Sequence, residues 1–334
     1  MCASCTAPCG ARDSPVCRAG RIAVAGLVVL VATLGGCRSP LPPPAKPAPV
    51  PPTTAAPPPS PASVLRGDEI IVAGYRFSTG TRVVTWLEPG GYDGHAKTAV
   101  PRAGLAGLPP SREFAALQKT VDQFVLHYDG CGLSRICFNT LKERKLSVHF
   151  LLDVDGTIYQ TLDLRERALH ATIANDRSIG IEIANLGAYP EKGKERQILA
   201  EWYRRDAAGR TVMQVPARIK ETGIRTPGFV ARPVRPDLVR GSLQGKPLVQ
   251  YDYTPEQYAA LAKLTATLTR VFPKMTADYP HGRDGRLIPQ VLSQGKYASF
   301  SGVLGHFHVQ ENKVDPGPAF QWRKLFDAVK RERK

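Results

Sequence analysis

The residues best suited to chemistry in this 334-residue chain are histidines that follow short apolar runs. His127 ends the run Phe124-Val-Leu, and His306 ends the run Val303-Leu-Gly. The loop after His306 contains Glu311 and Asp315, so it can return a carboxylate to the same place. A hydrolytic zinc site needs two or three imidazoles or carboxylates and an open position for water. His127 and His306 are therefore candidate ligands, although lone histidines are more often structural.

The chain has seven histidines, and the others compete for these roles. His308 is the main competitor of His306, because residues i and i+2 share one face of a strand. The glycine before His306 favours His306. His149 lies inside an apolar stretch and is expected to be packed. His95 and His281 lie in glycine-rich loops and are given no role.

A candidate acid–base group lies in the alternating segment Ile179–Ala184. A period of two places its isoleucines on one face of a strand and Gly180, Glu182 and Ala184 on the other. A carboxylate between small residues on a sheet face is what the floor of a cleft would look like. The alternative is a solvent-facing glutamate on an edge strand.

The elements that must position these residues follow from periodicity, caps and turns. Asp155-Gly156 predicts a hairpin between Ser147–Val154 and Thr157–Leu162, and Thr254-Pro-Glu-Gln is a capping box before a helix. The remaining expected elements are a hairpin over Ile70–Trp86, strands over Asp122–His127, Ser178–Asn185 and Val303–His306, and helices over Ser111–Gln118, Arg135–Lys145 and Ala319–Lys330. This mixture predicts an α/β fold with a mixed central β-sheet flanked by helices.

The N-terminal region has the composition of an export signal. Ile22–Leu34 is apolar, follows Arg18 and Arg21, and is too short to span a bilayer. Leu34-Gly-Gly-Cys37 resembles a bacterial lipobox, which predicts lipidation of Cys37; the alternative is a signal peptide that happens to contain a cysteine. We expect a signal peptide at 1–36, a proline-rich tether at 37–62 and a folded domain at 63–334, with a surface insertion at about 190–250.

The formal net charge of +16 favours polyanionic partners. No sequence signature of a nucleic-acid-binding module is present, and a signal peptide removes the protein from nucleic acid. After cleavage only Cys37, Cys131 and Cys137 would remain. With Cys37 acylated, an oxidising compartment favours a Cys131–Cys137 disulfide, the alternative being two free buried thiols.

Five segments in order resemble the N-acetylmuramoyl-L-alanine amidase family, which includes phage lysozyme-type amidases and peptidoglycan recognition proteins. The resemblance covers roughly 110–190 and 250–325. Each motif alone is weak, and their order makes the signal specific. The segments are Phe124-Val-Leu-His-Tyr, Ser147-Val-His-Phe-Leu-Leu-Asp-Val-Asp-Gly, Ala168-Leu-His-Ala, Ser178-Ile-Gly-Ile-Glu-Ile-Ala-Asn, and Gly305-His followed by Lys313-Val-Asp-Pro-Gly-Pro and Trp322.

The resemblance implies that zinc is bound by His127, His306 and Asp315. Many relatives use cysteine as the third ligand, so the chain resembles the aspartate-using bacterial branch. The spacing of Cys131 and Cys137 also resembles a disulfide of the recognition proteins, which lies just after their first zinc histidine.

The same resemblance implies that Glu182 is the catalytic acid–base group and that Lys313 stabilises the oxyanion. It places His170 and Asn185 near the substrate. The sequence departs from the family where some amidases carry a catalytic tyrosine, because that position is Val148. The glutamate version of the mechanism is therefore expected.

Together these features predict a zinc amidase that cuts the bond between the lactyl group of N-acetylmuramic acid and L-alanine. Its partners would be peptidoglycan or muropeptides, and it would be a monomer with a lipid anchor, in the outer membrane facing the periplasm. The alternative is a binding module of the same fold that does not cut. The complete ligand set and Glu182 favour the enzyme.

Overall fold

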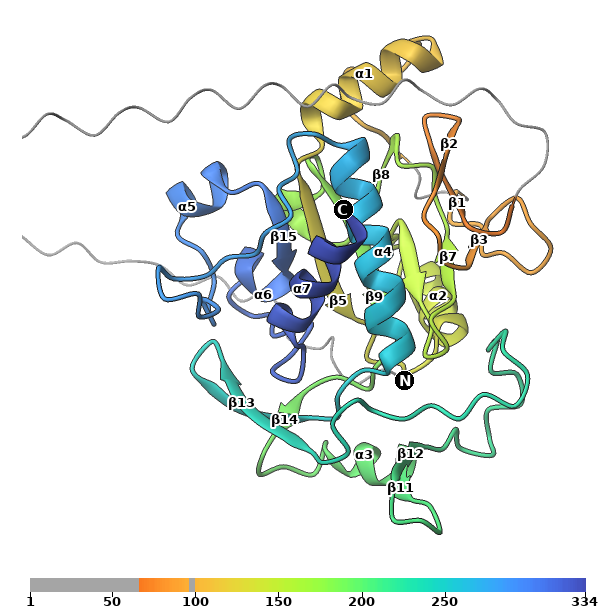
Figure 1. Cartoon of the computed structure of the whole chain (residues 1–334), viewed down its shortest axis with the longest axis vertical. Helices are drawn as coiled ribbons and strands as arrows, with labels where there is room; N and C mark the ends of the chain where they lie inside the picture. Colours follow the sequence, from red (N-terminus) through yellow and green to blue (C-terminus); the bar gives the residue numbers. More distant parts are fainter. Residues whose placement is uncertain (1–65, 96–99) are drawn as a thin grey trace, which may run out of the picture. The chain divides into compact units, whose positions relative to one another are not determined.

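A six-stranded mixed β-sheet organises the chain (Figure 1), whose computed structural model describes residues 66–95 and 100–334. The strand order is β15-β5-β9-β6-β7-β3. These strands are β15 (Gly302–Gly305), β5 (Gln123–Tyr128), β9 (Ser178–Ile183), β6 (Phe150–Leu152), β7 (Ile158–Gln160) and β3 (Val83–Thr85). All neighbours are parallel except β6 and β7. The predicted α/β fold with a mixed central sheet flanked by helices is confirmed.

Alternation along the strands decides which helices cover which face. Phe124, Leu126 and the isoleucines of β9 belong to the main core, which also contains apolar residues of α4 (Pro255–Val271), α7 (Trp322–Glu332) and α1 (Pro110–Thr120). Leu151 of β6 points to the other face and packs with Cys137 of α2 (Ser134–Glu143). Figure 1 shows α4 and α7 side by side.

Helix α4 begins as its sequence predicts. The Oγ1 atom of Thr254 accepts a hydrogen bond from the backbone N–H of Gln257 at 3.1 Å. The Gln257 side chain accepts one from the backbone N–H of Thr254 at 2.9 Å. This reciprocal capping box, with Pro255 at the first helical position, satisfies donors that the helix itself leaves unpaired.

Of the two predicted hairpins, the one over Ile70–Trp86 is confined to the first part of that range and turns at Ala73-Gly74, and the one at Asp155-Gly156 is present. The first joins β1 (Glu69–Val72) and β2 (Tyr75–Ser78), and the chain then continues into β3 of the main sheet. The second joins β6 and β7 across Asp155-Gly156. The remaining short elements are β4 (Val100–Pro101), β8 (Glu166–Arg167), the 3₁₀ turn η1 (Thr172–Ala174), α5 (Gln294–Ser299) and α6 (His306–Val309).

The segment 190–250 forms several short elements with an apolar cluster of its own. They are β10 (Tyr189–Pro190), α3 (Gln197–Trp202), β11 (Tyr203–Arg205), β12 (Thr211–Met213), β13 (Val239–Leu243) and β14 (Lys246–Gln250). Trp202, Tyr203 and Val249 pack there with Leu186, which follows β9. Figure 1 shows this green-to-teal segment below the sheet.

Most predicted boundaries differ from the structure by a few residues, and two of the differences lie in the C-terminal part of the chain. The strand expected over Val303–His306 ends at Gly305, and His306 is the first residue of helix α6. The closing helix begins at Trp322 rather than at Ala319. The expected signal peptide (1–36), tether (37–62) and Cys37 lie outside the described residues. Among the residues described, no helix is both long and apolar enough to cross a membrane.

Replacing Thr254 by alanine should lower the free energy of unfolding by about 0.5–2 kcal/mol, the range measured for loss of an N-cap. The Oγ1 atom of Thr254 also donates to the carbonyl of Val154 at 2.7 Å, which adds to the loss. Urea unfolding followed by circular dichroism measures the effect. Thr254→Ser keeps the hydroxyl and is the control; an equal loss in both variants would contradict the capping explanation.

Candidate metal centre

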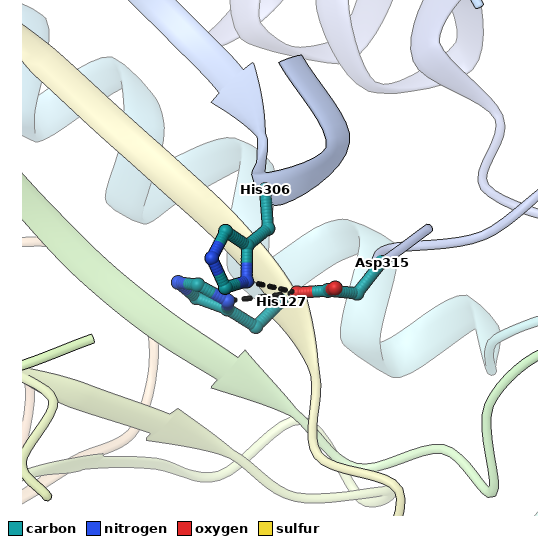
Figure 2. A group of neighbouring side chains, drawn as sticks. All are labelled: His127, His306 and Asp315. Carbon is teal, nitrogen blue, oxygen red and sulfur yellow. Dashed lines mark hydrogen bonds and ion pairs between the residues drawn. The ribbon is translucent and has the colours of Figure 1, made fainter. Parts of the chain in front are cut away.

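The site forms where two parallel strands end side by side. Strand β15 pairs with β5 so that Gly305 lies opposite Leu126. The residues that follow them, His306 and His127, therefore come together although they are far apart in the sequence. The loop after α6 brings Asp315 back to the same place (Figure 2).

The side chains of His127, His306 and Asp315 converge on one point. The Oδ2 atom of Asp315 lies 2.8 Å from Nδ1 of His127 and 3.0 Å from Nδ1 of His306. All three residues are buried, and one donor atom from each lies within 4.8 Å of the others. Two imidazole nitrogens and a carboxylate oxygen are a donor set of catalytic zinc sites. The group can therefore hold a divalent metal ion.

The electrostatics of the group suit metal binding at neutral pH. Burial and, next, the nearby His306 lower the pKa of His127 to about 4, against the opposing effect of Asp315. Burial alone would raise the pKa of Asp315, but the two imidazoles hold it well below its usual range. Metal ligands must be deprotonated, and His127 and Asp315 both are at pH 7.

The outer nitrogens of both imidazoles contact other side chains. Nε2 of His306 lies 2.6 Å from Oε1 of Gln310, and Nε2 of His127 lies 3.0 Å from Nδ1 of His170. Nε2 of His170 in turn lies 3.1 Å from Oγ of Ser178. If the Nδ1 atoms bind an ion, each Nε2 carries the hydrogen, and Gln310 and His170 accept it. Such partners fix the orientation and tautomer of ligand histidines.

The ring of His170 lies directly on the backbone of Gly180. A Cβ atom at Gly180 would be 2.6 Å from Nδ1 of His170, so a larger residue would displace the ring. This close approach explains the glycine in the middle of a buried strand. The expected contact of His170 with substrate stays a prediction, and the structure adds its contact with His127.

Glu182 lies beside His127 on the sheet. The parallel pairing of β5 with β9 puts the two residues opposite each other, and Leu151 of β6 is on the other side of Glu182. The isoleucines of β9 are in the core, as alternation predicts, so Glu182 is on the face that His127 shares. Its side chain is half-buried.

Lys313 lies in the loop between His306 and Asp315 and is half-buried. Its positive charge is close enough to add to the effects of burial and of His306 in lowering the pKa of His127. The site thus combines a metal-binding group, a carboxylate and an ammonium group.

Asn185, expected near the substrate, is instead a buried structural residue that is 3% exposed. Its Nδ2 atom donates to the carbonyl of Tyr251 at 3.1 Å. Its Oδ1 atom accepts from the backbone of Gly187 and from the side chain of Gln250. With both groups of its side chain bonded inside the protein, Asn185 joins the end of β9 to the chain around residue 250.

The predicted Cys131–Cys137 disulfide is wrong, because Cys137 is a free, buried thiol. The Sγ atom of Cys131 lies 3.9 Å from Oγ1 of Thr140, one turn of α2 beyond Cys137. Burial raises the pKa of Cys137 well above its usual value, and the charge of Glu182 raises it further. Cys137 is therefore a protonated core residue at neutral pH.

His308 lies outside the triad. Residues 306–309 are helical, so His306 and His308 do not share a face. His308 is buried; its Nδ1 accepts from the N–H of Gly305, and its Nε2 lies 2.9 Å from the carbonyl of Ile288. Both ring nitrogens are thus bonded within the protein.

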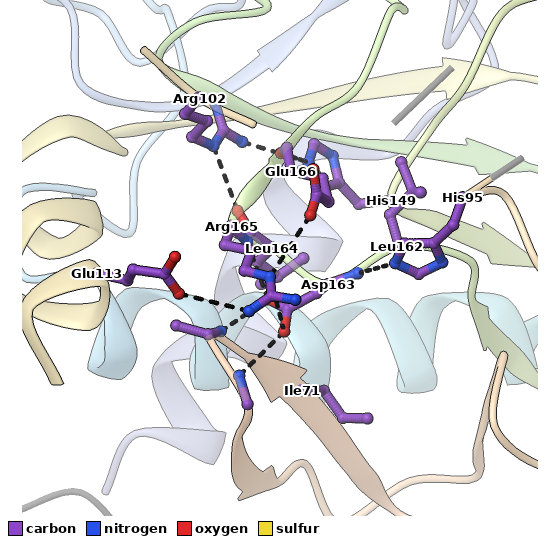
Figure 3. Close-up of polar contacts among 12 residues, drawn as sticks. Ile71, His95, Arg102, Glu113, His149, Leu162, Asp163, Leu164, Arg165 and Glu166 are labelled. Carbon is purple, nitrogen blue, oxygen red and sulfur yellow. Dashed lines mark hydrogen bonds and ion pairs between the residues drawn. The ribbon is translucent and has the colours of Figure 1, made fainter. Parts of the chain in front are cut away.

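His149 is packed, as expected from its apolar segment. Its Nδ1 accepts from the backbone N–H of Gly180 at 3.0 Å, and its Nε2 lies 3.0 Å from the carbonyl of Glu166. Figure 3 shows it next to Arg102, a buried residue that donates to several backbone carbonyls, among them that of Ser178. These contacts connect β9 with the chain around Glu166, which leads to His170.

Gln310 and Ser178 are contacts that the sequence analysis missed. Gln310 comes four residues after His306, a spacing that brings side chains together on a helix. The signal was hidden because the residues before it predict a strand. Ser178 is two residues before Gly180, so both lie on the face of β9 that carries Glu182.

The comparisons with known proteins agree with this geometry. The family model for N-acetylmuramoyl-L-alanine amidase matches residues 117–318, a span that includes the whole triad. The chain belongs to the N-acetylmuramoyl-L-alanine amidase family. No curated protein sequence matches it.

Solved structures of amidases and endolysins are similar at low sequence identity. A selenomethionine derivative of AmpD is 17% identical with a TM-score of 0.34, covering 72% of this chain and 96% of that one. The endolysin LysCS from Clostridium intestinale, an N-acetylmuramoyl-L-alanine amidase, is 15% identical with a TM-score of 0.32, covering 64% and 86%. The Ph2119 endolysin from a Thermus scotoductus bacteriophage is 12% identical with a TM-score of 0.35, covering 74% and 99%.

Substitution of His306 should separate it from His308. His306→Ala removes one of three converging donors, so the purified amidase should lose bound zinc. His308→Asn keeps an acceptor for the N–H of Gly305 and should retain zinc near the level of the unmodified protein. Atomic absorption after dialysis measures the metal. Loss of zinc from the His308 variant with retention in the His306 variant would reverse the assignment.

Removing the side chain of His170, which contacts Nε2 of His127, should weaken zinc binding without abolishing it. We expect His170→Leu to raise the zinc dissociation constant about 10–100-fold, the usual effect of losing such a partner. His170→Asn can still place an acceptor near the Nδ1 position and should recover part of the affinity. Competition with a chromophoric chelator measures both, and equal affinity in all three proteins would show that the contact does not matter.

Proposed function

We propose that this amidase hydrolyses the amide bond between the lactyl group of N-acetylmuramic acid and L-alanine of peptidoglycan, with zinc held by His127, His306 and Asp315. The convergence of two buried imidazoles on one carboxylate oxygen, with Glu182 on the neighbouring strand, supports it most directly. When bound, zinc supplies a water nucleophile at neutral pH and polarises the scissile carbonyl.

Glu182 is proposed as the proton carrier. Its register opposite His127, on the same sheet face, supports this role, because a carboxylate there would lie beside a water at the metal centre. It would accept a proton from the attacking water and pass it to the nitrogen of the leaving L-alanine. The amine then leaves as the amino terminus of the stem peptide, and the lactyl carbonyl becomes a carboxylate.

Lys313 is proposed to stabilise the negative charge that develops on the carbonyl oxygen. Lys313 lies in the loop that also carries His306 and Asp315, and its positive charge is close enough to contribute to the lowered pKa of His127. A fixed positive charge in a partly buried site acts more strongly than one in water.

A binding module that does not cut remains the second candidate for this fold. The presence of a complete donor set, with Glu182 and Lys313 beside it, favours hydrolysis. Release of stem peptides with a free L-alanine amino terminus from purified peptidoglycan, detected by mass spectrometry, distinguishes the two. Binding without release would support the second candidate.

The location of the enzyme is a proposal that rests on its sequence. A lipid on Cys37 and the proline-rich tether would hold the domain at the outer membrane, facing the peptidoglycan in the periplasm. Labelling with a fatty acid analogue tests the anchor directly.

Glu182→Gln should separate chemistry from metal binding. Glutamine fills the same volume but cannot take the proton, so kcat should fall about 10²–10⁴-fold. Zinc content should stay at that of the unmodified enzyme, because Glu182 is not a ligand. The assay is release of stem peptide from soluble muropeptide, with zinc measured in the same preparation.

Glu311→Gln is the matched control, since it makes the same change at an exposed glutamate of the loop before Asp315. It should leave kcat and zinc unchanged. Near-normal turnover of Glu182→Gln would remove this residue from the mechanism. Loss of zinc from that variant would make Glu182 a ligand.

A further inference from the structure

The insertion at 190–250 contacts the loop beside the metal centre through one hairpin. Strands β13 and β14 pair tightly, with Leu243 opposite Lys246, so Gln244 and Gly245 form a two-residue turn. This turn contacts the segment 306–315, called the ligand loop here because it carries His306, Lys313 and Asp315. No motif of the sequence predicts this contact.

A single side chain makes most of the connection. Nε2 of Gln244 lies 2.8 Å from the carbonyl oxygen of Phe307, 3.2 Å from that of Gln310 and 3.3 Å from that of Lys313. Its two hydrogens are thus shared among three carbonyls spread over the ligand loop. Its Oε1 atom accepts from the N–H of Val291 at 3.1 Å. The amide is therefore bonded at both ends.

The backbone of Gln244 is unusual for its residue type. Its φ is +54° and that of Gly245 is +72°, so both lie in the left-handed region. Two-residue hairpin turns of this kind favour asparagine, aspartate or glycine at the first position, because other side chains are strained there. Strained positions persist where the surrounding structure requires them. Here the contacts of the long glutamine side chain provide the reason.

The rest of the hairpin contacts the chain that directly follows the ligand loop. A Cβ atom at Gly241 would be 2.6 Å from Cβ of Pro318, so the strand lies against that residue. Gln250, at the far end of β14, donates to the carbonyl of Pro316 at 3.0 Å and accepts from the N–H of Ala319 at 3.0 Å. The hairpin thus holds the chain on both sides of Asp315.

We propose that Gln244 is a positioning residue: it holds the ligand loop in the conformation that presents His306 and Lys313 to the metal centre. The insertion is then a part of the functional site and not only a surface segment. The consequence for zinc rests on the proposed function, whereas the hold on the loop is a property of the protein without metal.

Two variants test the proposal in complementary ways. Gln244→Gly removes the side chain and relieves the left-handed strain. Gln244→Glu keeps the shape but has no N–H groups to donate to the three carbonyls. Gln214→Glu is the matched control, because it makes the same isosteric change at an exposed residue of the same insertion.

Hydrogen–deuterium exchange of the metal-free proteins measures directly whether Gln244 keeps the ligand loop ordered. Within the loop, Phe307 donates to the carbonyl of Asp315, Gln310 to that of His306, and Lys313 to that of Gln310. We expect these amides to exchange at least about tenfold faster in both Gln244 variants, and at the original rate in the control. Unchanged exchange in both variants would overturn the proposal.

Zinc titration measures the consequence. The dissociation constant for zinc should rise about tenfold or more in both Gln244 variants, as for other residues that support ligands, and the visible spectrum of bound Co²⁺ should change. Faster exchange with unaltered zinc affinity and Co²⁺ spectrum would overturn the positioning role. Failure of the unmodified protein to bind zinc would instead contradict the proposed function, and exchange would still decide whether Gln244 holds the loop.

Discussion

The contact of one carboxylate oxygen with two imidazole nitrogens is the constraint on which the site depends. Asp315 is 7% exposed, and His127 and His306 are 2% and 5% exposed, so three polar groups lie together away from water. A buried carboxylate is tolerated only when it is paired and hydrogen-bonded. The pairing of β5 with β15 and the closure of the ligand loop must therefore both form before these groups can be buried at acceptable cost.

One face of strand β9 supports this arrangement with residues at a spacing of two. Ser178 contacts His170, Gly180 leaves room for the ring of His170, and Glu182 lies beside His127. A strand that alternates strictly can serve the core with one face and the site with the other. Its isoleucines fix the register that aligns Glu182 with His127, because a slip of one residue would bury the carboxylate in the core.

The features that could be predicted from the sequence depend on residues that are close together in the chain. Alternation placed Glu182 on the face opposite the isoleucines, and the capping box located the start of α4. The change from strand to helix at His306 follows from tertiary structure, because a short apolar run fits either state. The disulfide could not be judged either, since pairing of Cys131 and Cys137 depends on the direction of their side chains and not on their separation in the sequence. The structural role of Asn185 could not be predicted either, because its hydrogen-bond partners Gln250 and Tyr251 are distant in the sequence.

The insertion shows why a segment without clear periodicity can still matter for chemistry. The ligand loop carries two candidate metal ligands, and such a loop must be held to within a fraction of an ångström to bind an ion well. A longer helix or strand in place of the loop could not return Asp315 to within 3.0 Å of His306. External contacts are the remaining way to fix such a turn. Gln244 and Gln250 supply them from a hairpin that short-range sequence patterns do not associate with the site.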